Sequence, residues 1–289
     1  MRVHVTGGSG FLGGSVVPRL VARGHVVSAL ARSPQAAARA AALGATPVVG
    51  DLDDSTSLDE AFTASRAQAL VNLASLGFGH ATAIVAAAEE AGLERAVFVS
   101  TTAVFTTLDP SSKSVRLAAE ETVRSSALDW TIVRPTMIYG TPADRNMARL
   151  LRLVRRSPVV PLPGGGKRLQ QPVHLDDIAC AIVTAAETRS CAGREYNMAG
   201  PEPLTLRQAV VEAAAALGRS PRLVAVPLAP VRTALQCYER VVRHPRLSVE
   251  QLQRLGEDKS FDISAAGRDL GFAPRSFRAG ITQEAAMLW

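Results

Sequence analysis

The chain has 289 residues, of which 47% are hydrophobic and 20% are charged, a composition typical of a globular protein. No apolar run is long enough to span a bilayer, and a strand-like run begins at Val3, so we expect no membrane partner and no signal peptide. The net charge is +6, but the basic residues are dispersed and aromatics are few, which argues against nucleic acid as a partner. Cys180, Cys191 and Cys237 match no metal-ligand spacing, so we expect no metal, a reduced cytoplasmic setting and a core position for Cys180.

The first predicted unit is a strand, a glycine-rich turn and an apolar helix from about Phe11 to Arg23. Gly7 permits a tight turn, Gly10 lets the backbone approach a pyrophosphate, and Gly13 allows close packing of the helix. The free N–H groups at the helix start would then face the phosphates. Such a triplet is a weak indication by itself, since glycines also end strands, but here a strand precedes it and a helix follows.

The spacing Thr6-Gly7-x-x-Gly10-x-x-Gly13 resembles the short-chain dehydrogenase/reductase superfamily, and Gly10-Phe11-Leu12-Gly13 is similar to its extended or atypical branch. The resemblance implies an α/β fold, a Rossmann-type doubly wound parallel sheet with a small C-terminal substrate lobe. It implies cofactor contacts from Thr6, Gly7, Gly10, Phe11, Leu12 and Gly13. We expect residues 1–140 and about 173–199 to form the dinucleotide-binding domain, and residues 141–172 and about 200–289 to form the substrate lobe.

The end of the second predicted strand, residues 25–31, indicates the type of dinucleotide. An NAD-binding chain usually carries an acidic residue there for the ribose hydroxyls, whereas this chain has Arg32 and Ser33. A guanidinium and a hydroxyl suit a 2′-phosphate, so we predict NADP as the cofactor, with NAD as the alternative. The competing interpretation is that Arg32 is an ordinary exposed arginine.

Two further strand ends carry candidate cofactor contacts. Pro47 to Gly50 is predicted as a short buried strand, and the resemblance places the following Asp51 and Leu52 beside the adenine; the alternative is that the acid only turns the chain. Ala74 and Ser75 follow the strand at residues 69–73 and should line the ribose and nicotinamide side. His80, at the start of the next helix, is a candidate catalytic group, and the alternative is a loop histidine.

The strand at residues 95–100 leads into Thr101 and Thr102. This segment resembles the one that presents an active-site Ser or Thr in the superfamily, with Thr101 as the better match. A hydroxyl at this strand end could polarise a substrate oxygen, or it could only satisfy the frayed end of the strand.

The next helix departs from the superfamily pattern, in which Tyr-x-x-x-Lys supplies the proton relay. Members of the superfamily usually carry a Glu four residues after this lysine. Counting back from the matching Glu of this helix puts Ser112 at the tyrosine position and Arg116 at the lysine position. Arg116 can hold a ribose or a phosphate, but its high pKa makes it useless as a proton carrier.

The segment from Leu128 to Gly140 resembles the sixth strand and the Arg-Pro signature of extended and atypical members. Pro135 and Met137 are expected at the nicotinamide end of the cofactor, and Tyr139, Arg145 and Asn146 at the substrate. Asp144 is predicted to cap the helix that follows. Residues 158–166 are predicted as a loop and residues 221–230 as an extended linker.

Three functions remain open from the sequence. The first is an NAD(P)-dependent oxidoreductase or epimerase-like enzyme acting on a small, hydrophobic or natural-product-like molecule, as a monomer or homodimer. The second is a non-redox enzyme on the same fold that catalyses dehydration, cyclisation or rearrangement. The third is a non-catalytic regulator that senses NADP. The absent tyrosine favours the last two, whereas Thr101 and the Arg-Pro segment favour an enzyme.

Overall fold

The computed structural model describes residues 1–288 except 109, 145, 243–252 and 254–255. A seven-stranded sheet has the order β11-β6-β5-β4-β1-β2-β3, and all its neighbouring strands are parallel. The strands are β1 (Arg2–Thr6), β2 (Val26–Ala31), β3 (Thr46–Val49), β4 (Ala69–Asn72), β5 (Arg95–Val99), β6 (Asp129–Pro135) and β11 (Arg194–Met198). The strand order reverses direction between β1 and β4, which confirms the doubly wound Rossmann-type fold.

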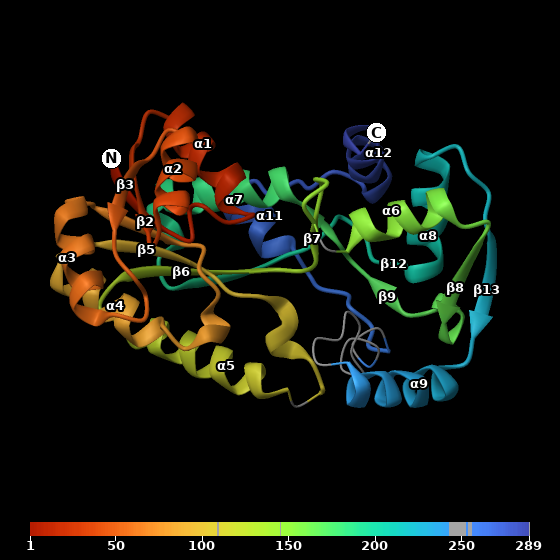
Figure 1. Ribbon diagram of the computed structural model, residues 1–289. Helices are drawn as coiled ribbons and strands as arrows, with labels where there is room; N and C mark the ends of the chain where they lie inside the picture. Colours follow the sequence, from red (N-terminus) through yellow and green to blue (C-terminus); the bar gives the residue numbers. More distant parts are fainter. Residues whose placement is uncertain (109, 145, 243–252, 254–255, 289) are drawn as a thin grey trace.

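Helices cover both faces of this sheet, as Figure 1 shows. On one face lie α1 (Gly13–Ala22), α2 (Pro34–Ala42), α7 (Leu175–Glu187) and α11 (Ser264–Leu270); on the other lie α3 (Ser55–Ser65), α4 (Ala81–Glu90) and α5 (Ser111–Arg124). Along β4, Leu70 packs into one of the two cores and Val71 into the other, because successive strand residues face opposite sides. Burial on both sides explains why the central strands are nearly continuous apolar runs.

A second group of elements packs beyond the carboxyl end of the sheet. It comprises β7 (Ile138–Tyr139), α6 (Met147–Arg156), β8 (Val159–Pro163), β9 (Leu169–Gln170), β10 (Val173–His174), β12 (Leu204–Thr205), α8 (Leu206–Ala216), β13 (Arg222–Val226), α9 (Leu228–Val241) and α12 (Phe277–Met287). Short 3₁₀ turns are η1 (Leu76–Phe78), η2 (Thr102–Phe105), η3 (Gly164–Gly166) and η4 (Arg189–Cys191). Between these helices, Leu151, Ala213 and Ile281 form part of a separate apolar core. We call the strands and helices beyond the carboxyl end of the sheet, β7 to β10, β12, β13, α6, α8, α9 and α12, the second lobe.

Several local expectations are wrong, each for a tertiary reason. The expected loop at residues 158–166 and the expected linker at residues 221–230 contain β8 and β13, which pair with each other in parallel across a long sequence separation. Cys180 is exposed, and Cys191 is the buried cysteine. Residues 46–49 form the edge strand β3, so Val49 is 82% exposed.

The segment 264–272, near the end of the chain, packs with elements from the first half of the chain and with α7. Its Ala266, Leu270 and Phe272 pack in the core shared by α1 and α7, away from the second lobe. This segment, which we expect in the substrate lobe, lies against the parallel sheet. The division into two domains by residue ranges stays a prediction. Among the described helices, none is both long and apolar enough to cross a membrane.

Candidate cofactor and substrate site

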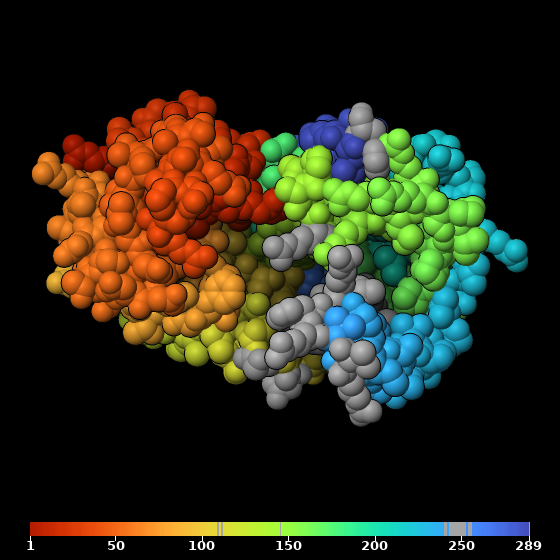
Figure 2. Space-filling model, viewed as in Figure 1, coloured from red at the N-terminus to blue at the C-terminus, as the bar shows by residue number. Residues whose placement is uncertain are grey.

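A cavity of about 540 Å³ lies between the carboxyl end of the parallel sheet and the second lobe. Figure 2 shows the surface hollowed between the N-terminal elements and the residues coloured green. The described residues that line it are Gly7, Gly10, Phe11, Leu12, Leu73, Ser75, Leu76, Val99, Ser100, Thr101, Arg116, Pro135, Thr136, Ile138, Ala143, Asp144 and Asn146. The volume is in the range of small-molecule and cofactor sites.

The glycine turn forms one end of this cavity. Gly7 has a φ of 69°, in the left-handed region that glycine adopts without strain. A Cβ on Gly13 would lie 2.1 Å from the carbonyl oxygen of Gly8, so the helix start packs directly on the turn. No side chain caps α1. The N–H of Gly14 donates to the carbonyl oxygen of Gly10 at 3.1 Å and that of Ser15 to the carbonyl oxygen of Leu12 at 3.0 Å, so an anion would meet the N–H groups that precede Gly14. These features fit the pyrophosphate of a dinucleotide.

Thr6 lies behind the turn rather than in the cavity. Its hydroxyl donates to Oδ1 of Asn72 at 2.5 Å, and the Asn72 amide donates to the carbonyl oxygen of Ala74 at 3.1 Å. Both side chains are fully buried, so they fix the ends of β1 and β4 relative to each other. Asn72 is a supporting residue that sequence reasoning missed; its polar side chain at the end of an apolar strand was the available signal.

The residues expected at the adenosine end lie outside the cavity lining. Arg32 is exposed at the end of β2, and the Ser33 hydroxyl accepts the N–H of Ala36 to cap α2. Asp51 and Leu52 are half-buried after β3. His80 is paired through Nε2 with Asp53 at 2.8 Å and stands at the start of α4, so the structure does not bring it to the cavity.

The two adjacent threonines have different surroundings. The Thr101 oxygen accepts the N–H of Ala103 at 3.2 Å, which leaves its own hydrogen free to donate, and the residue lines the cavity. The Thr102 hydroxyl is buried and lies 3.4 Å from the carbonyl oxygen of Pro135 on β6. Of the two, Thr101 is therefore the one that lines the cavity.

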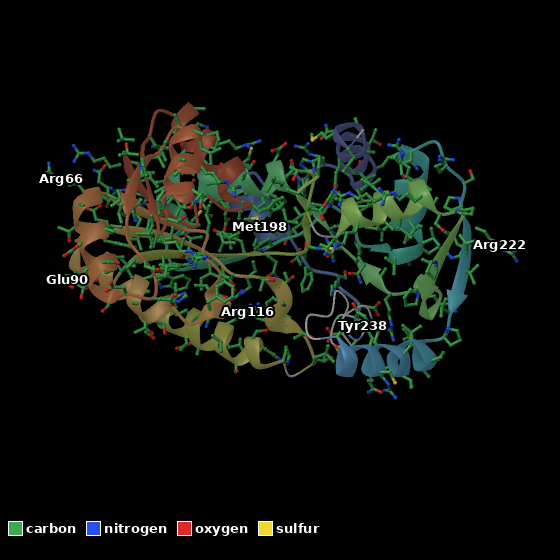
Figure 3. All side chains as sticks on the ribbon, viewed as in Figure 1. Arg66, Glu90, Arg116, Met198, Arg222 and Tyr238 are labelled. Atoms are coloured by element: carbon green, nitrogen blue, oxygen red, sulfur yellow. The ribbon has the colours of Figure 1, made fainter. Side chains whose placement is uncertain are left out.

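Arg116 extends from α5 to the cavity wall, and Figure 3 shows it between that helix and the sheet. Its Nη1 donates to the Ser112 hydroxyl at 2.7 Å and to the Ser112 carbonyl at 3.2 Å. Its guanidinium also packs against Gly77, where an added Cβ would lie 3.0 Å from Nε. Ser112 is thus a support for Arg116, and Ser112 itself does not line the cavity.

A buried ionic network holds the strand ends beneath Thr101. The Ser100 hydroxyl donates to Glu120 at 2.6 Å, and Arg134 donates to both oxygens of Glu120 at 2.8 and 2.6 Å. Arg134 also reaches Glu195 at 2.6 Å. Burial opposes ionisation of Glu195, but hydrogen bonds from Arg124 and Arg134 outweigh it and lower the pKa of Glu195.

The segment after β6 crosses from the cofactor side to the second lobe. Pro135 lines the cavity, while Met137 is half-buried against the core of the second lobe. Tyr139 is 1% exposed and packs on His174 and Phe277, so the structure places this expected substrate contact in the core. Asn146 lines the cavity, Asp144 caps α6 as expected, and Arg145 lies outside the described residues.

The two residues expected at the end of β4 lie at the cavity edge. Ala74 is half-buried, and Ser75, which caps η1, lines the cavity.

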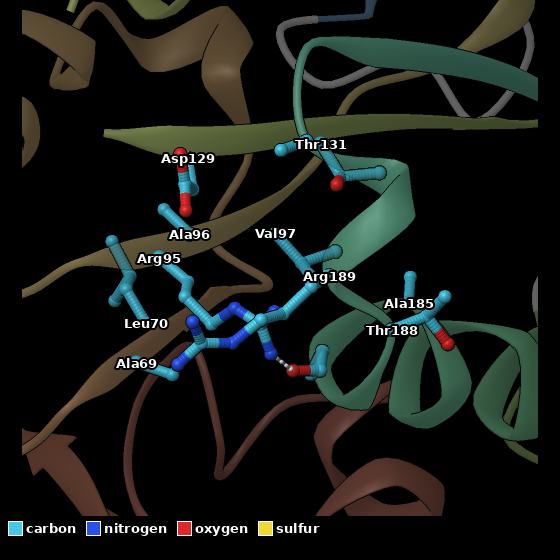
Figure 4. Close-up of a pocket in the computed structure, with 12 residues that line it drawn as sticks. Ala69, Leu70, Arg95, Ala96, Val97, Asp129, Thr131, Ala185, Thr188 and Arg189 are labelled. Atoms are coloured by element: carbon cyan, nitrogen blue, oxygen red, sulfur yellow. Dashed lines mark hydrogen bonds between the residues drawn. The ribbon is translucent and has the colours of Figure 1, made fainter. Parts of the chain in front are cut away.

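A second hollow, shown in Figure 4, lies at the amino end of the parallel strands. It measures about 10 Å³ and lies between β4, β5, β6 and the end of α7, where Arg95 donates to the carbonyl oxygen of Ala186. That volume is close to the minimum that holds one water molecule, so this hollow takes no cofactor.

Comparison with known proteins agrees with the glycine turn and the cavity. A family model described as NAD(P)H-binding matches residues 7–189. The chain belongs to this NAD(P)-binding family.

Two relatives and one solved structure are similar to this chain. A Stigmatella aurantiaca protein named 4-hydroxy-2-methyl-3-oxo-4-farnesyl-3,4-dihydroquinoline-1-oxide ketoreductase is 28% identical, over 95% of this chain and 92% of that protein. Ceramide reductase from Caulobacter vibrioides is 30% identical over 80% of this chain and 75% of its own length. The structure of Thermus thermophilus UDP-glucose 4-epimerase with NAD has a TM-score of 0.75 at 20% identity, over 100% of this chain and 99% of that one. This last likeness is one of fold.

Proposed function

We propose that this NAD(P)-binding protein is an NADP-dependent reductase of a bulky, apolar carbonyl compound. The observation that carries the proposal is the position of Thr101, whose free hydroxyl hydrogen faces the same cavity as the glycine turn. A bound dinucleotide would supply the hydride. Its pyrophosphate would lie against Gly7, Gly10 and the start of α1, with Arg32 and Ser33 favouring a 2′-phosphate.

The chain's own groups would orient the carbonyl and stabilise developing negative charge. Thr101 donates a hydrogen bond toward the substrate oxygen, and Arg116 adds a positive charge to the same wall. Neither is an efficient proton donor near neutral pH, because the pKa of a hydroxyl and that of a guanidinium are both too high. Since His80 is engaged by Asp53 outside the cavity, water or a group on the substrate is the better candidate for the proton.

The lining supports an apolar substrate. On the substrate side it presents the apolar Ile138, Ala143 and Val99 beside the polar Thr136, Asp144 and Asn146. Arg116 is the one residue with a positive charge among the described lining residues. A nucleotide sugar would place a diphosphate there, for which several cations or backbone N–H groups are normally needed. The named relatives, which act on a farnesyl-bearing quinoline and a ceramide by their names, support the same class.

Steady-state reduction by NADPH tests the function. A long-chain 3-oxo ester is compared with acetone and benzaldehyde, using the unmutated protein, Thr101→Val and Thr101→Ser. We expect turnover of the long-chain ketone alone, a drop of about tenfold to a hundredfold in kcat for Thr101→Val, and partial recovery in Thr101→Ser, with NADPH affinity unchanged. Robust reduction of the simple carbonyls, or unchanged kcat in Thr101→Val, would contradict the proposal. NADPH binding without turnover of any carbonyl would favour a redox sensor or a non-redox enzyme.

A further inference from the structure

The C-terminal helix α12 carries a carboxyl group that is fully buried next to the cavity wall. Glu284 is 0% exposed, and its Oε2 accepts the N–H of Gly140 at 3.0 Å. Its other oxygen, Oε1, has no hydrogen-bond donor among the described residues. A buried carboxyl oxygen without a donor is costly if the group is ionised, so its protonation state needs an explanation.

Asp144, which lines the cavity, is the group that faces Glu284. The Asp144 carboxylate is 6% exposed and accepts backbone N–H groups from Asn146 at 2.5 Å, Met147 at 2.8 Å and Ala148 at 3.0 Å. These bonds use a carboxylate as the cap of α6, and they set the position of Asn146 in the cavity wall. These three bonds tie Asp144 to the segment that forms the substrate side of the site, and they leave room for a further donor, because an ionised carboxylate has about four acceptor sites.

Two carboxyl groups can form a hydrogen bond with each other only when one of them holds a proton. Burial, followed by the hydrogen bond and negative charge of Asp144, raises the pKa of Glu284 to about 9. A protonated Glu284 that donates to Asp144 would give the otherwise unpartnered Oε1 a hydrogen-bond partner.

The other groups around Glu284 do not titrate near that pH. Arg152 on α6 favours the ionised form but keeps its charge throughout. Burial raises the pKa of Tyr139 on β7 well above its usual range, and burial lowers the pKa of His174 on β10, so both stay neutral. Where α8 packs against α12, Ala209 and Ala213 face the shared apolar core.

We propose that Glu284 is a positioning residue, which as a neutral acid donates a hydrogen bond to Asp144 and so holds the cavity wall formed by Ala143, Asp144 and Asn146. Loss of the shared proton places two negative charges in a buried site. The cap of α6 then loosens, and Asn146 moves with it. The wall of the substrate site is thereby coupled to the docking of α12 and to alkaline pH.

The experiment uses the full chain without substrate, so its result is independent of the proposed reductase activity. Infrared spectra at neutral pH detect protonated carboxylic acids, because ordinary Asp and Glu are ionised there. We expect a protonated-acid band in the unmutated protein that is lost in Glu284→Gln. The matched control is Glu212→Gln on α8, which removes a carboxylate paired with Arg278 and should keep the band.

Hydrogen exchange then reads the cavity wall. After correction for intrinsic rates, exchange of the amides of residues 146–148 should rise severalfold as pH passes about 9 in the unmutated protein. In Glu284→Gln, whose amide donates at every pH, protection should persist. Retention of the infrared band in Glu284→Gln, or an equal loss of protection in both proteins, would overturn the proposal.

Should Glu284→Gln fail to fold, Asp144→Asn provides a second variant. Its amide oxygen can still accept the N–H groups of Asn146 and Met147, which bind Oδ1, and its amide nitrogen, which replaces the Oδ2 that accepts from Ala148, can donate to an ionised Glu284. We expect the alkaline loss of the acid band to move to lower pH in this variant. An unchanged transition would show that Asp144 does not hold the proton on Glu284, and the proposal would be wrong.

Discussion

A side chain on helix α5 is the departure that we predict from the superfamily pattern that this chain resembles. We align Arg116 with the usual lysine, and its guanidinium is held by Ser112 and packed on Gly77. A fixed guanidinium can bind an anion or an oxyanion, but it cannot relay a proton. In the proposed reductase, the protein would therefore contribute charge and orientation more than proton transfer.

Arg32 is the residue on which the proposed cofactor preference depends. It is exposed at the end of β2, so replacing it removes little packing. We expect Arg32→Ala to weaken NADP(H) binding about tenfold to a hundredfold, since charge-assisted hydrogen bonds contribute about 1.5–3 kcal/mol, and to change NAD(H) binding little. Fluorescence titration measures the affinity for both cofactors. Arg39→Ala, at an exposed position of α2, is the control for general loss of positive charge. Equal affinities of the unmutated protein for both cofactors would contradict the preference.

At the scale of elements, the unit formed by β1, the turn and α1 requires two different properties of its glycines. Gly7 needs a positive φ, whereas Gly13 needs the space that a side chain would occupy against Gly8. Gly14, the next residue, has open space where a Cβ would lie. Adjacent glycines in one helix turn thus have opposite tolerance to substitution.

The pair Gly13→Ala and Gly14→Ala tests this directly. The first places a Cβ 2.1 Å from the Gly8 oxygen, so we expect it to lower the free energy of unfolding by about 3 kcal/mol and to weaken dinucleotide binding. The second should be neutral or stabilising by up to about 1 kcal/mol, because alanine is the better helix former. Chemical denaturation and cofactor titration measure both effects, and similar behaviour of the two variants would be the contrary outcome.

At the scale of the whole molecule, a segment of the C-terminal region bridges the two sides of the cleft. Glu257 accepts the hydroxyls of Thr106 and Thr107 at 2.6 Å and the N–H of Thr107 at 2.7 Å. The adjacent Asp258 accepts from Arg168 and from the N–H of Leu169 on the second lobe. The loop between Thr101 and α5 is therefore tied through neighbouring acids to strand β9.

Removal of this tie should loosen the loop without unfolding the protein. We expect Glu257→Ala to increase hydrogen exchange at residues 106–108, while Glu202→Ala, an exposed acid of the same lobe, leaves it unchanged. Burial raises the pKa of Glu257, but hydrogen bonds from Thr106 and Thr107 outweigh it and bring the pKa below 4.5. The stabilisation is thus present above that pH and is lost as pH falls through the folded-state pKa. Exchange that is insensitive both to this mutation and to acid would contradict the tie.

The sequence by itself determined the fold class, the glycine turn and the NAD(P)-binding family, because these depend on local signals: short apolar strands, glycine spacing and helix caps such as Ser33 and Asp144. Tertiary structure alone decided the rest. The pairing of β8 with β13, the exposure of Cys180 and the burial of Tyr139 depend on which distant segments pack together. The meeting of Glu284 with Asp144 is of the same kind, since a proton shared across 140 residues of chain leaves no local pattern. For the predicted site residues that line the cavity, the chemical role remains a prediction. Their shared location follows from the convergence of the strand ends at one side of the sheet.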